Sequence, residues 1–141
     1  MLLFGSRRKE HAAHQYLVSM LNRLWVEGQQ HVDGPRIEDR VSFTLPVAVV
    51  PLERGRPQFE ARINCLTKDL GAAGFAIVPS GPFPWDSALV GFSESGAMHW
   101  LKATVRHRVV LGGGFTQVGM HVSELADPDD YSGLNEITLD E

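Results

Sequence analysis

The chain has 141 residues and a formal net charge of -4, with 43% hydrophobic and 21% charged residues. This composition is typical of a globular domain with a hydrophobic core, and it excludes a disordered or fibrous chain. The acidic balance also argues against a protein that binds nucleic-acid polymers, because such proteins normally carry a strongly basic surface.

The sequence indicates a cytoplasmic protein without a membrane span. Its single cysteine, Cys65, cannot form an internal disulfide, which favours a reducing compartment. The apolar start is followed by Arg7, Arg8 and Lys9, the reverse of the charge order in a secretory signal. No run approaches the roughly 20 apolar residues that a spanning helix needs.

Residues 7–31 have the pattern of an amphipathic helix. Apolar residues recur at intervals of three and four and form one stripe, which consists of Tyr16, Leu17, Met20, Leu21, Leu24 and Trp25. Ser6 is the expected N-cap, and Gly34-Pro35 ends the helix. The stripe must pack either on the domain that follows or on a second copy of the chain in a homodimer.

After Arg40, short runs of β character alternate with turn residues at the spacing of an all-β barrel or sandwich. The expected strands cover residues 42–50, 59–66, 75–79, 88–93, 98–110 and 115–122. Pro46, inside the first run, indicates an edge strand or a bulge. Three glycines, residues 112–114, form the turn before the last strand.

The late part of the chain carries two further patterns. Alternation along residues 98–110 predicts one face with Leu101, Ala103, Val105, His107 and Val109, and another with Lys102, Thr104, Arg106 and Arg108. From Glu124 the tail is acidic and rich in turn residues. We expect this tail to be partly disordered or lightly docked.

Two motifs flank the first two long strands: "RIEDR", from Arg36 to Arg40, and "DLGAAG", from Asp69 to Gly74. In a hairpin, the entrance of one strand and the exit of the next lie at the same end, so Arg36, Arg40 and Asp69 can converge. Guanidinium groups suit phosphates and flat bases, and a carboxylate accepts hydrogen bonds from the guanine ring N–H and amino group. Glycines allow backbone amides to approach a ligand closely. The combination indicates a ligand that joins phosphates to guanines.

The region from about Arg36 to Leu125 resembles a PilZ domain, the bacterial receptor module for cyclic di-GMP. The family pattern is Arg-x-x-x-Arg and, after a gap, Asp/Asn-x-Ser-x-x-Gly, which Arg36, Arg40, Asp69 and Gly74 match. The stretch "ATVRHRVVLGGGFTQVGMHV" is similar to the last hairpin of the family. The resemblance implies a mainly β fold, a six-stranded antiparallel Greek-key barrel, here preceded by an N-terminal amphipathic α-helix.

The chain is therefore expected to have a helical extension over residues 1–34, a barrel domain over 35–126 and an acidic tail over 127–141. The resemblance implies a cyclic di-GMP site that consists of Arg36, Arg40, Asp69, Gly71 and Gly74, with Lys68 as a basic neighbour. Gly71 stands where the family has serine, so one neutral hydrogen bond, worth roughly 0.5–1.5 kcal/mol, is absent. Pro35 leaves open whether one or two ligand molecules bind.

We expect a non-catalytic receptor in which cyclic di-GMP orders the Arg-x-x-x-Arg segment and changes a docking surface for a downstream protein. The alternative is a PilZ-like interaction module that does not bind nucleotide, which Gly71 and the acidic charge favour slightly. No Ser-His-Asp order supports an enzyme. His11 and His14 lie one helical turn apart, but no third ligand is evident, so we expect no metal site and no cofactor.

The remaining candidates have simpler interpretations. Cys65 is expected to be a small core residue rather than a nucleophile. Trp100 is most simply a packing residue. Arg54, Arg56, Arg106 and Arg108 could extend the site, but the simpler expectation is that they are solvated surface charges.

Overall fold

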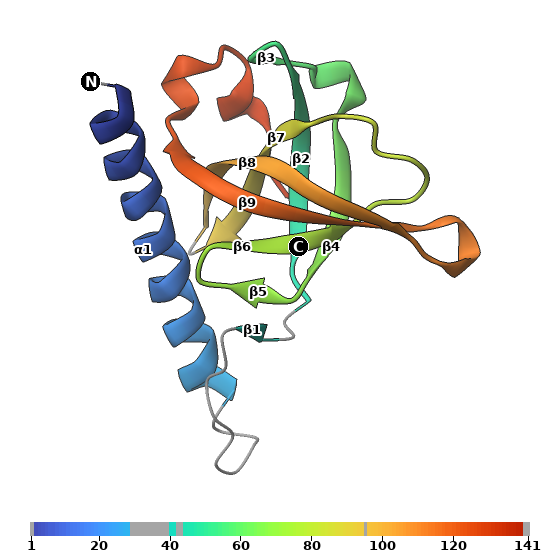
Figure 1. The fold of residues 1–141 in the computed structure, drawn as a ribbon, viewed down its shortest axis with the longest axis horizontal. Helices are drawn as coiled ribbons and strands as arrows, with labels where there is room; N and C mark the ends of the chain where they lie inside the picture. Colours follow the sequence, from blue (N-terminus) through green and yellow to red (C-terminus); the bar gives the residue numbers. More distant parts are fainter. Residues whose placement is uncertain (1, 29–39, 42–43, 95, 140–141) are drawn as a thin grey trace.

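The computed structural model describes residues 2–28, 40–41, 44–94 and 96–139; for residues 2–6, 24–28 and 40–41 it describes the backbone alone. Within this part of the chain, one long helix, α1 (Leu2–Gly28), lies along the side of an antiparallel barrel (Figure 1). None of the helices in these residues combines the length and the apolar character needed to cross a bilayer.

Six described strands form the barrel wall: β2 (Pro46–Glu53), β4 (Ile63–Lys68), β6 (Gly74–Val78), β7 (Ser87–Glu94), β8 (Ala97–Val110) and β9 (Thr116–Ala126). Their order around the wall is β2-β4-β6-β9-β8-β7, and β7 pairs with β2 to close the sheet. The first four wall strands stand in the order β7-β2-β4-β6, which is the Greek-key arrangement. The expected mainly β fold with a six-stranded Greek-key barrel is confirmed.

Shorter elements join the wall strands. β1 (Arg40–Val41) pairs with β5 (Leu70–Gly71), and β3 (Arg56–Pro57) continues the pairing of β2. Four described 3₁₀ turns complete the chain: η1 (Phe59–Ala61), η2 (Gly112–Gly114), η3 (Pro128–Asp130) and η4 (Leu134–Glu136).

Pro46 does not mark an edge or a bulge, so that prediction is wrong. It is the first residue of β2, opposite Leu66 of β4, and β2 also pairs with β7 farther along. A proline at the first position of a strand removes a ladder hydrogen bond only where pairing begins, which a central strand tolerates.

The barrel interior is one apolar cluster that takes buried or partly buried side chains from all six wall strands, with Phe75 and Leu101 among them. Ala13, Leu17, Met20 and Leu21 of α1 belong to the same cluster. Burial of a leucine as complete as that of Leu17 stabilises the fold by roughly 1.5–3 kcal/mol. The described part of the helix stripe therefore packs on its own domain rather than on a second chain.

The helix begins earlier than its sequence signals indicate. It starts at Leu2, so Ser6 lies inside the helix and the prediction of Ser6 as N-cap is wrong. The described helix ends at Gly28, and the expected stop at Gly34-Pro35 lies outside the described residues. Leu2, Leu3 and Phe4 can extend the helix, and an isolated glycine such as Gly5 is tolerated within a helical pattern at a modest cost.

A bulge in β8 reverses the expected alternation of side chains. Val105 pairs with Met120 and His107 with Gly119, so Arg106 is an extra residue on this strand. Because Met120 and Gly119 are adjacent, Val105 and His107 point to opposite faces, and the prediction of a shared face is wrong beyond Val105. The His107 ring lies where a Cβ at position 119 would be, so the ring packs directly against the Gly119 backbone.

A second apolar cluster covers the outer face of β2, β7 and β8. The C-terminal segment supplies Leu134, which is fully buried, and Ile137, which is 6% exposed, and both pack with Trp100 of β8. The expectation of a partly disordered or lightly docked tail is therefore corrected for residues up to 139. Apolar side chains among the acidic residues attach the segment to the barrel.

Candidate functional site

The entrance of β2 and the exit of β4 lie side by side. The backbone N–H of Leu45 donates to Thr67 Oγ1 at 3.0 Å, and the N–H of Thr67 donates to the Leu45 carbonyl at 2.9 Å. Thr67 is one of the few buried polar residues of the described chain. The segments before β2 and after β4 are thus brought to one end of the barrel, as the hairpin argument requires.

At this end, β1 and β5 join the two sequence motifs through their backbones. Arg40 lies opposite Gly71, and Val41 lies opposite Leu70, in antiparallel register. Arg36, the other arginine of the first motif, lies outside the described residues. The second arginine of Arg-x-x-x-Arg is therefore in direct backbone register with the central glycine of Asp-x-Gly-x-x-Gly.

The "DLGAAG" turn has a conformation that its residue types explain. Asp69 adopts a φ of 55°, in the left-handed region where aspartate is one of the more tolerated side chains. It follows the last residue of β4 and directs the chain into β5. A Cβ at Gly74 would collide with the carbonyl oxygen of Met120 in β9, so the close packing of β6 on β9 already requires glycine.

The basic residues considered for the site separate into two groups. Lys68 is adjacent to Asp69, and its Nζ donates to Gln117 Oε1 of β9 at 3.4 Å. Arg54 and Arg56 lie in and after the β2–β3 turn, at the opposite end of β2 from the paired motifs. Lys68 alone of these three residues lies beside the "DLGAAG" turn.

Arg108 has a structural role that the sequence did not indicate. Its Nε donates to the Phe83 carbonyl at 2.8 Å, and one terminal nitrogen donates to the Trp85 carbonyl at 2.5 Å and contacts Asp86 at 3.4 Å. The bulge at Arg106 turns this guanidinium toward the loop between β6 and β7. Arg108 is exposed, as expected of a surface charge, but its hydrogen bonds hold the side chain at the loop between β6 and β7.

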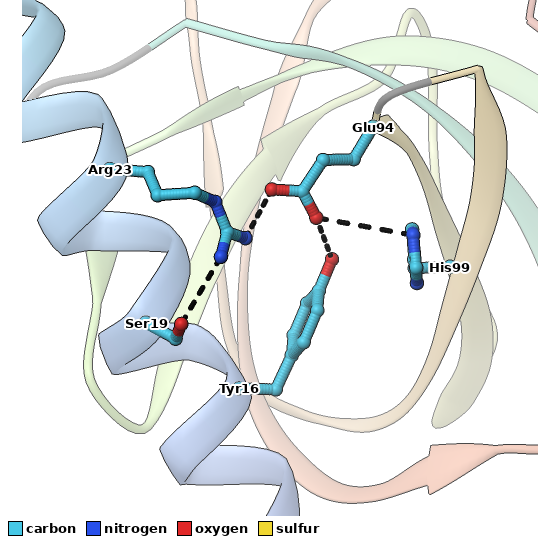
Figure 2. A network of polar contacts seen from close by, with 5 residues as sticks. All are labelled: Tyr16, Ser19, Arg23, Glu94 and His99. Carbon is cyan, nitrogen blue, oxygen red and sulfur yellow. Dashed lines mark hydrogen bonds and ion pairs between the residues drawn. The ribbon is translucent and has the colours of Figure 1, made fainter.

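The helix is close to the candidate site because α1 contacts β5 (Figure 1). Figure 2 shows a polar network that fixes the helix to the β7–β8 hairpin through the Glu94 carboxylate. Tyr16 donates its hydroxyl to Glu94 Oε1 at 3.0 Å, and Arg23 forms an ion pair with Oε2 of the same carboxylate. His99 of β8 stacks on the Tyr16 ring with centroids 5.6 Å apart.

A second polar contact links the helix to β9. The Nε2 of His14 donates to the Val122 carbonyl at 2.9 Å, and the Nε2 of His121 lies 2.6 Å from Glu10 Oε2. Sequence reasoning missed this cluster, although the four-residue spacing of Glu10 and His14 is a helical signal. The third member is 111 positions from Glu10, and no local pattern connects them.

The comparisons with known proteins concern the fold. No family model matches the chain, and neither does any curated protein. The solved structure of the Bacillus subtilis inhibitor of motility (MotI/DgrA) is similar, with a TM-score of 0.50 and 20% identity. The match covers 73% of this chain and 49% of that chain, so the chain spans about half the length of that protein. The likeness supports a PilZ-like fold.

Proposed function

We propose that the protein is a non-catalytic cytoplasmic receptor for the bacterial messenger cyclic di-GMP, which binds at the β1–β5 end of the barrel. The observation that carries this proposal is the pairing of Arg40 with Gly71, which joins the two sequence motifs at one place. Arg36 and Arg40 bind the phosphates and stack on guanine, and Asp69 accepts hydrogen bonds from a guanine edge.

Charge and backbone geometry support this assignment. Cyclic di-GMP carries two phosphates, and two guanidinium groups with the nearby Lys68 ammonium complement that charge although the whole chain is acidic. Gly71 has no side chain, so a ligand can approach its backbone closely. The serine hydroxyl that is missing at this position costs about one neutral hydrogen bond. We therefore expect weakened but saturable binding.

The signal passes to a partner protein through α1 in this proposal. The segment that contains Arg36 directly follows the helix, and α1 contacts β5, which pairs with Arg40. If the ligand binds one conformation of this segment more tightly, that conformation becomes more populated. The helix then shifts to the position on the barrel that this conformation of the segment allows. The changed surface of helix and barrel is then the output.

Calorimetric titration of the full chain with cyclic di-GMP tests the receptor. We expect saturable binding by the wild type and an affinity at least about tenfold lower for Arg40→Ala, because a hydrogen bond to a charged group contributes roughly 1.5–3 kcal/mol. Arg54→Ala is the matched control, since Arg54 is an exposed arginine at the other end of β2. It should bind like the wild type.

The alternative function is protein docking without nucleotide, and an exposed apolar hairpin favours it. Val110 is 85% exposed at the end of β8, and Phe115, just before β9, is 45% exposed. If the wild type shows neither heat nor a thermal shift at high cyclic di-GMP, the receptor proposal is wrong and this alternative replaces it. Equal losses in Arg40→Ala and Arg54→Ala would also contradict the site.

A further inference from the structure

Three side chains that commonly bind metals meet where α1 packs on β9. Glu10 and His14 lie one turn apart on the helix, and His121 reaches them from the strand. One potential ligand atom of each side chain lies within 4.8 Å of the others. All three residues are half-buried, with side-chain exposures of 42% for Glu10 and 24% for His121.

The ligand set matches a known coordination chemistry. Two imidazoles and one carboxylate, with water as a fourth ligand, form open tetrahedral Zn²⁺ sites in proteins. Metal–ligand bonds of about 2.0–2.1 Å place tetrahedral ligand atoms about 3.3 Å apart, so the widest separation must shorten by at most about 1.5 Å, and the 2.6 Å contact between His121 Nε2 and Glu10 Oε2 must lengthen by about 0.7 Å. Rotation of the Glu10 side chain, which is partly exposed, can supply much of this movement.

The hydrogen bond of His14 prepares it for this role. A carbonyl oxygen only accepts, so His14 donates Nε2–H to the Val122 carbonyl. In the tautomer with the proton on Nε2, the lone pair that a metal can bind lies on Nδ1. Histidine ligands characteristically donate their other ring N–H to a carbonyl or carboxylate, which fixes the tautomer and the ring orientation.

The contact between His121 and Glu10 also suits a metal cation, which could replace the proton of their hydrogen bond. A glutamate carboxylate is charged at neutral pH, which is the form that binds cations. A bridging cation would replace the hydrogen bond between His121 Nε2 and Glu10 Oε2, which lie 2.6 Å apart. The positive charge of Arg106 acts on Glu10 and opposes a cation, so binding depends on direct coordination.

We propose that Glu10, His14 and His121 form a Zn²⁺ site that fastens α1 to the barrel wall. Two ligands come from the helix and one from β9, so the ion links the two elements. The inference is independent of nucleotide binding, because the β1–β5 pairing uses none of these residues. The competing interpretation is an ion pair between His121 and Glu10 that needs no metal.

Titration of the full untagged chain with ZnCl₂, in competition with a chromogenic chelator, tests the site. We expect one ion per wild-type chain and affinities at least about tenfold lower for His14→Ala and His121→Ala, since even indirect partners of a metal contribute on that scale. His11→Ala is the matched control, because His11 is an exposed histidine on the same helix. It should retain the wild-type affinity.

Thermal unfolding with and without ZnCl₂ provides a second measurement. Zinc should raise the Tm of the wild type and His11→Ala but not of His121→Ala, because a ligand stabilises only the state that binds it. Glu10→Gln retains the size of the side chain but not its charge, so it tests binding even if an alanine variant does not fold. The proposal would be overturned if the wild type showed no saturable binding, or if both His14→Ala and His121→Ala bound zinc with wild-type affinity. The ion pair between His121 and Glu10 would then be the correct interpretation.

Discussion

Burial controls the chemistry of Cys65 at the scale of the single residue. This side chain lies on β4 against the barrel interior, opposite Val47 of β2. Burial raises the pKa of its thiol to about 11, and a hydrogen bond with the Val78 backbone opposes the shift only in part. The sequence-based interpretation of Cys65 as a core residue agrees with this environment.

The native thiol should therefore react slowly. The shift from 9.0 to about 11 reduces the thiolate fraction by about a hundredfold at neutral pH, and alkylation by iodoacetamide should slow accordingly. The same chain in urea is the control and should react at the ordinary rate. Equal rates in the two states would contradict the burial of Cys65.

The sign of the associated pH effect follows from the direction of the shift. A raised pKa in the folded state leaves stability unchanged below pH 9, where the thiol is protonated in both states. Above pH 9 the unfolded chain loses this proton first, so the contribution of Cys65 to stability falls until about pH 11. Cys65→Ala should lack this part of the alkaline decline in urea stability.

At the scale of the element, polar contacts with one carboxylate define how α1 sits on the barrel. Glu94, with a side chain 24% exposed, accepts from the Tyr16 hydroxyl and pairs with Arg23 (Figure 2). Burial is the main reason that the pKa of Tyr16 is raised, and the neighbouring carboxylate adds to it. The Tyr16 hydroxyl therefore stays protonated and donates its hydrogen bond to Glu94 across the ordinary pH range.

Removal of that partner should loosen the helix. Glu94→Ala leaves the half-buried Tyr16 hydroxyl without its acceptor, and we expect a loss of roughly 1–3 kcal/mol in the free energy of unfolding in urea. Glu53→Ala removes an exposed glutamate from β2 and should change stability by less than about 0.5 kcal/mol. Equal effects of the two substitutions would show that the Glu94 network does not stabilise helix docking.

The elements themselves were largely predictable because their signals are local. Buried residues recur about every 3.6 residues in the helix stripe around Leu17 and every second residue in the strands, so both patterns are visible in the sequence. The bulge at Arg106 has no such signature, because it arises from how β8 fits β9. The two-residue pairing of Arg40 with Gly71 is likewise too short to produce a pattern.

At the scale of the whole molecule, the C-terminal segment acts as a cover for the outer face of the barrel. Leu134 is fully buried beside Trp100, which is 3% exposed. Leu134→Ala should lower the free energy of unfolding by about 2–5 kcal/mol, as truncation of a buried leucine generally does. Urea unfolding followed by tryptophan fluorescence measures this change.

Val110→Ala is the control for the same experiment, since an aliphatic side chain that is 85% exposed should contribute less than about 0.5 kcal/mol. A wild-type midpoint for Leu134→Ala would mean that the segment does not stabilise the barrel.

The candidate site was predictable only to the extent that strand geometry connects distant residues. The segments near Arg40 and Asp69 were predictable neighbours, because an antiparallel pair brings the start of one strand and the end of the next to the same end. The neighbours of Glu10 were not predictable in this way. His121 reaches that residue through the packing of a helix on a sheet, a contact that depends on the complete fold.

Closure of the wall between β2 and β7 restricts how other proteins can recognise this one. Open sheets present a row of unsatisfied amide and carbonyl groups, onto which an incoming peptide or a neighbouring copy can add as a further strand. Each of the six described wall strands is flanked on both sides along part of its length. Association by strand addition is thus disfavoured there, and partners must be selected by side-chain shape and charge on the helix, the hairpin or the loops.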